Sequence, residues 1–105
     1  MATFYVQDVY NIKGVGIIPV GKVESGIIKL GMQANLGSTV VKIKSIEMHH
    51  EKLQEAKEGL NVGILVEITG NFNPVNPSFF GKLLGGRSPE LELMRSYMQK
   101  RIDFN

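Results

Sequence analysis

The sequence predicts an all-β fold, a small closed or nearly closed β-barrel, followed by one C-terminal helix. The first observation is the stretch 8–32, in which glycines repeatedly interrupt apolar runs rich in β-branched residues. Glycine inside a strand pattern marks a bulge, a sharp bend or a close backbone approach, and a sheet that curls on itself needs such devices. The second observation is strict alternation over residues 61–69, which places Val62, Ile64, Val66 and Ile68 on one face.

Alternating apolar and polar residues predict the remaining strands. These are residues 3–10, 17–23, 32–36 and 39–48, with a short apolar piece at 27–30. The apolar phase slips once near Ser45, which predicts a bulge. Residues 49–58 are polar and predict a short helical turn or excursion. Asparagines and prolines predict a loop over 70–78, after which residues 79–84 supply a last short strand.

A terminal helix is predicted over residues 88–103. Ser88 is a suitable N-cap and Pro89 a suitable first helical residue. Apolar residues then recur at helical spacing, namely Leu91, Met94, Met98 and Ile102. We expect this stripe to pack on a barrel. The predicted organisation is therefore a β-barrel over residues 1–86 and a helix over residues 87–105.

Composition limits the class of protein. The chain has 105 residues, of which 43% are hydrophobic and 21% charged, as is usual for one soluble globular domain. The net charge of +2 permits an anionic partner, although a solvated surface of mixed charge gives the same balance. The absence of cysteine excludes disulfides and thiolate metal sites and fits a reducing compartment. Since no apolar run is long enough to span a bilayer, we expect a cytoplasmic protein with no membrane partner.

Residues 16–22 spell G-x-x-x-x-G-K, the beginning of a phosphate-binding loop. That loop needs a serine or threonine next, to bind magnesium, and a helix whose N-terminus faces the phosphates. Here Val23 follows, and the four spacer residues favour a strand. We therefore interpret the segment as a barrel strand and not as a nucleotide site.

Two histidines and two carboxylates are close together in the sequence at residues 47–51. A helical zinc site needs ligands one turn apart, whereas adjacent histidines at a strand end point in different directions. We interpret the cluster as a polar loop at the barrel rim, with no metal. No nucleophile elbow or pair of catalytic carboxylates is evident, so we predict that the protein is not an enzyme and uses no cofactor.

A series of short motifs occurs in order along the chain. They are Asp8-Val9-Tyr10, Gly14-Val15-Gly16, residues 19–26 (PVGKVESG), residues 29–32 (KLGM), residues 44–51 (KSIEMHHE) and residues 59–63 (GLNVG). Together they closely resemble domain 2 of translation elongation factor Tu, and more nearly of its archaeal and eukaryotic counterpart, elongation factor one-alpha. The resemblance covers about residues 3–69 and extends to residues 81–84 as the final strand. It implies the six-stranded translation-factor β-barrel, here without the GTPase domain and the third domain.

The resemblance also implies a surface for the aminoacylated end of tRNA. Glu47 stands where the family's glutamate packs against the terminal adenosine, and Asn61 where an asparagine contacts the aminoacyl ester. The matching wall positions of the pocket are Ile17, Ile18 and Leu65. His50 stands where the bacterial branch has an arginine near the 3′-terminal phosphate. Alternation independently places Asn61 and Leu65 on the face of their strand that is not core.

The leading functional hypothesis is a non-catalytic binding module associated with translation, which binds RNA such as the aminoacylated 3′ end of tRNA without GTP hydrolysis. The alternative is a protein-interaction module that docks on a ribosomal or translation-factor partner. A third reading is a structural remnant without retained binding. The sequence leaves the oligomeric state open.

Overall fold

The computed structural model describes residues 1–70 and 88–105. The strands and the helix in this part of the chain are β1 (Ala2–Ile12), β2 (Gly16–Ser25), β3 (Ile27–Lys29), β4 (Gln33–Leu36), β5 (Thr39–Met48), β6 (Glu51–Leu53), β7 (Glu55–Lys57), β8 (Asn61–Gly70), α2 (Pro89–Arg95) and β9 (Arg101–Phe104). The predicted all-β class with one C-terminal helix is confirmed.

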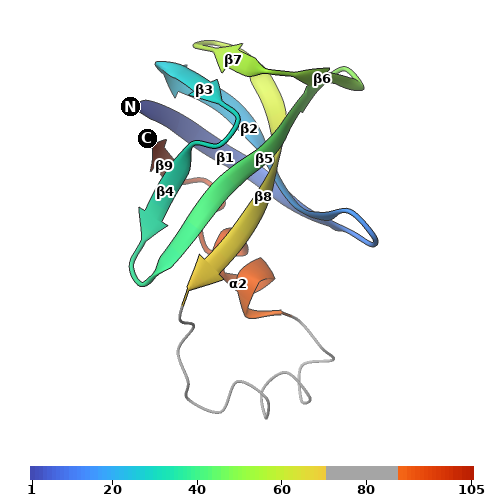
Figure 1. The fold of residues 1–105 in the computed structure, drawn as a ribbon, viewed down its shortest axis with the longest axis vertical. Helices are drawn as coiled ribbons and strands as arrows, with labels where there is room; N and C mark the ends of the chain where they lie inside the picture. Colours follow the sequence, from blue (N-terminus) through green and yellow to red (C-terminus); the bar gives the residue numbers. More distant parts are fainter. Residues whose placement is uncertain (71–87) are drawn as a thin grey trace.

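The strands form a nearly closed, six-stranded antiparallel barrel (Figure 1). Its order is β4-β5-β8-β2-β1-β9, with β6 paired to β5 beside this path, and β3 and β7 form a separate pair. The edge of β4 meets the end of β9, where Gln33 and Asn105 exchange backbone N–H···O bonds of 2.9 and 2.8 Å. Asn105 therefore links the two edge strands of the barrel, β4 and β9.

The core lies inside the barrel and follows the predicted alternation. On β8, Val62, Ile64 and Val66 are buried while Asn61 and Glu67 are exposed. The predicted bulge in β5 is confirmed, because the register with β8 shifts between Ile43 and Ser45. The extra residue, Lys44, is exposed, and the shift lets the strand keep Ile43 and Ile46 buried on either side of it.

The helical turn expected within residues 49–58 is wrong. The chain instead forms a hairpin, in which β6 folds back on β5 and Met48 lies opposite Glu51. The two linking residues, His49 and His50, have φ angles of 53° and 67°. Positive φ at both central residues is the geometry of the type I′ turn. This turn is favoured in two-residue hairpins because its twist matches the right-handed twist of the flanking strands.

The C-terminal helix is shorter than predicted. Ser88 caps α2 as expected, since its Oγ accepts a hydrogen bond of 3.1 Å from the Leu91 N–H. The helix ends at Arg95, however, and residues 101–104 form β9, which pairs with β1. Ile102 and Phe104 are buried at strand spacing, so part of the unit predicted as a helix completes the barrel. The predicted loop over 70–78, beyond its first residue, and the predicted strand over 79–84 lie outside the described residues.

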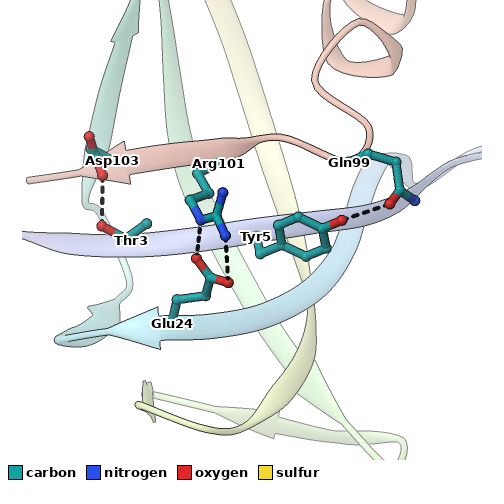
Figure 2. A network of polar contacts seen from close by, with 6 residues as sticks. All are labelled: Thr3, Tyr5, Glu24, Gln99, Arg101 and Asp103. Carbon is teal, nitrogen blue, oxygen red and sulfur yellow. Dashed lines mark hydrogen bonds and ion pairs between the residues drawn. The ribbon is translucent and has the colours of Figure 1, made fainter.

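Polar contacts fasten the C-terminal segment to β1 and β2 (Figure 2). The Thr3 hydroxyl donates to Asp103 at 2.7 Å, and the Tyr5 hydroxyl donates to Gln99 at 2.6 Å. Arg101 pairs with Glu24 of β2 and lies over the Tyr5 ring, 5.5 Å from its centroid. The hydrogen bond and charge of Glu24 raise the pKa of Arg101. Among the described helices, none is long and apolar enough to cross a membrane.

Candidate functional site

The candidate site lies on the outer face of the barrel, where β8 runs between β5 and β2. Because successive side chains of a strand point to opposite faces, the burial of Val62 leaves Asn61 and Gly63 facing outward. Gly63 lies opposite Glu47 of β5 on one side and opposite Val20 of β2 on the other. Three neighbouring strands thus present their outer residues at one place.

A shallow hollow of about 240 Å³ occupies this place. Its lining includes Gln7, Val20, Glu47, His49, Asn61 and Gly63. Gly63 forms the floor of the hollow and has no side chain to fill it. A Cβ at this position would lie 3.3 Å from both Ile18 Cγ2 and Val20 Cγ1, so these two side chains border the floor. The hollow therefore combines a carboxylate, an amide and a flat apolar floor.

The structure brings four of the six sequence-predicted residues onto this surface. Glu47 and Asn61 line the same hollow. Ile18 borders its floor beside Gly63. The β2–β8 register, with Ile17 opposite Val66 and Val20 opposite Gly63, sets Leu65 opposite Ile18 on the outer face. A polar hollow thus continues into an apolar strip.

The other two predicted residues lie elsewhere. Ile17 lies opposite the buried Val66 and packs against the core, so it is on the inner face. His50 is exposed in the turn between β5 and β6, and its neighbour His49 lines the hollow instead.

Sequence reasoning also missed Gln7. The register between β1 and β2 shifts between Val6 and Asp8, so Gln7 is the extra residue of a bulge. This bulge brings Gln7 to the hollow. The sequence signal is the three-residue spacing of the buried Val6 and Val9, which breaks the alternation of the strand.

The surroundings of the hollow are polar and carry charges of both signs. Glu47 lies opposite Lys52 of β6, and Asn61 lies opposite Lys22 of β2, so charged side chains of both signs surround the hollow. Within residues 1–70 and 88–105, no group of three or more His, Asp or Glu side chains is placed to hold a metal ion. The arrangement supplies hydrogen-bond donors and acceptors around an apolar floor.

Comparison with known proteins identifies the fold. The family model described as "Elongation factor Tu domain 2" matches residues 16–72, more than half of the chain. The chain belongs to the elongation factor Tu domain 2 family. Its matched region runs from β2 to β8 and contains Glu47 and Asn61.

Individual relatives agree with this assignment. The chain is 51% identical to elongation factor 1-alpha 2 of Euplotes crassus over 65 residues, which are 60% of this chain and 15% of the relative. It is 49% identical to elongation factor 1-alpha S of Porphyra purpurea over 67 residues, 61% of this chain and 13% of that protein. The chain thus spans about one seventh of the length of these relatives.

A solved structure shows the same barrel. The chain is similar to the apo form of translation elongation factor SelB from Methanococcus maripaludis, with a TM-score of 0.56 and 28% sequence identity. The likeness covers 66% of this chain and 16% of that one. The sequence match to elongation factor Tu domain 2 stops at residue 72, so α2 and β9 lie beyond it.

Proposed function

We propose that this chain is a non-catalytic, translation-associated module that binds an RNA end, such as the aminoacylated 3′ end of tRNA, in the hollow between β2, β5 and β8. The observation that supports the proposal is the meeting of Glu47 and Asn61 at one hollow, with Gly63 as its floor. The resemblance to elongation factor Tu domain 2 supports the same two residues, since it implies that Glu47 stands at the position for the terminal adenosine and Asn61 at the position for the aminoacyl ester.

The chemistry of the hollow suits an unpaired RNA end. Proteins recognise single-stranded RNA by stacking its bases on flat surfaces and bonding to base edges. The floor at Gly63 offers a flat surface, and Glu47 offers acceptor oxygens. The Asn61 amide both donates and accepts hydrogen bonds, so it suits an ester carbonyl. The apolar strip of Ile18 and Leu65 adjoins the floor.

The test is a titration of aminoacylated and uncharged tRNA against the protein and matched variants. Asn61→Ala removes one polar contact. The variant's affinity for aminoacylated tRNA should therefore be lower than that of the unaltered protein by a factor of about 2–10. Glu47→Ala should weaken binding without changing the salt dependence, because it removes no phosphate contact. Asn35→Ala and Glu67→Ala are the controls, since both residues are exposed on strands of the same barrel and neither lines the hollow.

Binding should also be weak and salt-sensitive, because one barrel with a net charge of +2 offers few phosphate contacts. Repeating each titration at two salt concentrations measures this dependence. Equal affinity for charged and uncharged tRNA, unchanged in the Asn61 and Glu47 variants, would refute the proposal. Docking on a ribosomal or translation-factor protein would then be the better hypothesis.

We predict no binding of GTP or GDP. The residues that spell G-x-x-x-x-G-K lie within β2, Gly16 opposite Ile12 and Lys22 opposite Tyr5. A strand in a ladder cannot wrap its N–H groups around phosphates as a loop at a helix N-terminus does. Calorimetry with magnesium and each nucleotide measures this directly, and low-micromolar binding would show the prediction to be wrong.

A further inference from the structure

The hairpin of β1 and β2 extends beyond the strand that flanks it. Figure 1 shows it projecting from the barrel as a free blue ribbon. β9 pairs with β1 only from Ala2 to Tyr5, and Val6 then bonds to Gln99 and Lys100. From Asp8 onward, β1 pairs with β2 on one side, and no other described strand pairs with its second side. This free side, over residues 8–12, is called the β1 edge below.

The bulge at Gln7 determines which residues of the β1 edge point their backbone N–H and C=O groups away from β2. Val6 bonds outward to Lys100 and Gln99. Because the bulge adds one residue at Gln7, the outward positions after it are Val9 and Asn11. Two contacts agree with this direction. The Val9 N–H donates to the Asp8 carboxylate at 2.8 Å, and Val9 lies opposite Pro19, which has no N–H to offer.

Apolar side chains accompany this edge. Tyr10 is 52% exposed and Ile12 46% exposed, and both lie on the same face of β1 because they are two residues apart. An edge strand with exposed large apolar side chains is a template for pairing with another chain. Within residues 1–70 and 88–105, no strand other than β2 pairs with residues 8–12 of β1, so this edge is open to a strand from another chain.

We propose that the β1 edge pairs antiparallel with the β1 edge of a second copy of this chain. Charge supports this partner and this direction. Asp8 lies at one end of the edge and Lys13 just beyond the other. Antiparallel pairing of two identical edges brings each Asp8 towards the Lys13 of the second copy, whereas parallel pairing brings like charges together.

The alternation also restricts the register, because outward-facing residues must meet outward-facing residues in an antiparallel ladder. Among the registers that meet this condition, the one with Val9 of one copy opposite Asn11 of the other uses both outward residues of the β1 edge. The two-fold axis then passes between the two Tyr10 residues. In this register Asn11 N–H can donate to Val9 C=O in both directions, while the bond between Val9 N–H and Asp8 remains. The two Tyr10 side chains form a cross-strand aromatic pair.

A cysteine cross-link tests the register. The chain has no cysteine, so one introduced thiol reports on a single position. A directly opposed pair without ladder bonds has its Cα atoms about 4.5 Å apart, within the range of roughly 4.4–6.8 Å that a disulfide spans. Under mild oxidation, Tyr10→Cys should be recovered as a disulfide-linked dimer. Val15→Cys is the control, because Val15 is 55% exposed at the hairpin tip and lies away from the axis.

A proline tests the edge itself. Asn11→Pro removes the outward N–H and leaves the bonds between β1 and β2 intact, which is the strand position that proline tolerates. Asn11→Ala keeps the N–H and serves as its control. In sedimentation, the unaltered chain and Asn11→Ala should associate with rising concentration, and Asn11→Pro should stay monomeric with an unchanged circular-dichroism spectrum. Adding Asn11→Pro to Tyr10→Cys should abolish the cross-link.

The proposal does not depend on RNA binding, and these measurements use no RNA. A chain that stays monomeric at high concentration, with Tyr10→Cys and Val15→Cys cross-linking equally little, would overturn it. A dimer that persists in folded Asn11→Pro would also overturn it, because the contact would then lie on another surface. Either result would show that a second copy of the chain does not occupy the β1 edge.

Discussion

Phe104→Ala is expected to lower the free energy of unfolding by about 3–5 kcal/mol, the usual cost of removing a buried phenylalanine side chain. Phe104 is fully buried on β9, opposite Ala2 of β1. The next residue, Asn105, makes the two backbone bonds to Gln33 that close the barrel. A cavity here therefore weakens both the core and the closure. Denaturant unfolding followed by circular dichroism measures the change.

Asp103→Ala is the matched control for this prediction. Asp103 lies on the same strand with its side chain exposed, and accepts one hydrogen bond from Thr3. Its removal should cost no more than about 1.5 kcal/mol. If the two variants unfold alike, β9 does not contribute to the core, and the barrel is completed in another way.

Most strands of the barrel could be predicted because the alternation of apolar and polar residues within each strand shows which face is buried. Period-2 alternation appears wherever one face of a strand meets the core, as in the run Val62, Ile64 and Val66. The bulge in β5 was predictable for the same reason. An extra residue at Lys44 moves the apolar phase by one position, and the sequence shows that shift directly.

β9 could not be predicted, because its apolar residues fit two periods. Ile102 continues the helical spacing of Leu91, Met94 and Met98, and it also alternates with Phe104 as a strand requires. Pairing with β1, almost the whole chain away, decides between them. The residues of β9 alone do not show that this segment pairs with β1. Gln99, whose φ of 66° redirects the chain, gives no signal of the kind that a glycine gives.

The candidate site was predicted in part for similar reasons. Alternation places Asn61 outward, so its position could be derived from the sequence, whereas the position of Glu47 came from the resemblance. The resemblance places both Ile17 and Ile18 in the pocket wall, although adjacent residues on a strand face opposite ways. The structure puts only Ile18 beside the hollow. Gln7 reaches the hollow through a bulge at which the buried positions shift from Val6 to Val9. The exposed Tyr10 and Ile12 continue the earlier apolar phase and hide this shift in the sequence.

Gly21→Ala is expected to have the largest effect of any single alanine substitution proposed for this chain. A Cβ at Gly21 would lie 1.8 Å from the Tyr5 carbonyl oxygen and 2.9 Å from its carbon. These are backbone atoms of the neighbouring strand, so no side chain can rotate away to make room. β1 and β2 would have to separate beside the bulge at Gln7, where Gly21 lies opposite Val6.

The expected loss exceeds about 4 kcal/mol, the level reached only when a specific structural requirement is violated. Since a domain of this size has roughly 5–15 kcal/mol of stability, Gly21→Ala should unfold at much lower denaturant concentration or fail to fold. Gly14→Ala is the control, because a Cβ at Gly14 meets nothing within 4 Å and its φ of +81° is the sole source of strain. That strain costs roughly 1–2 kcal/mol. A Gly21→Ala variant as stable as Gly14→Ala would mean that β1 and β2 do not approach as closely as described, and the bulge would then no longer explain how Gln7 reaches the hollow.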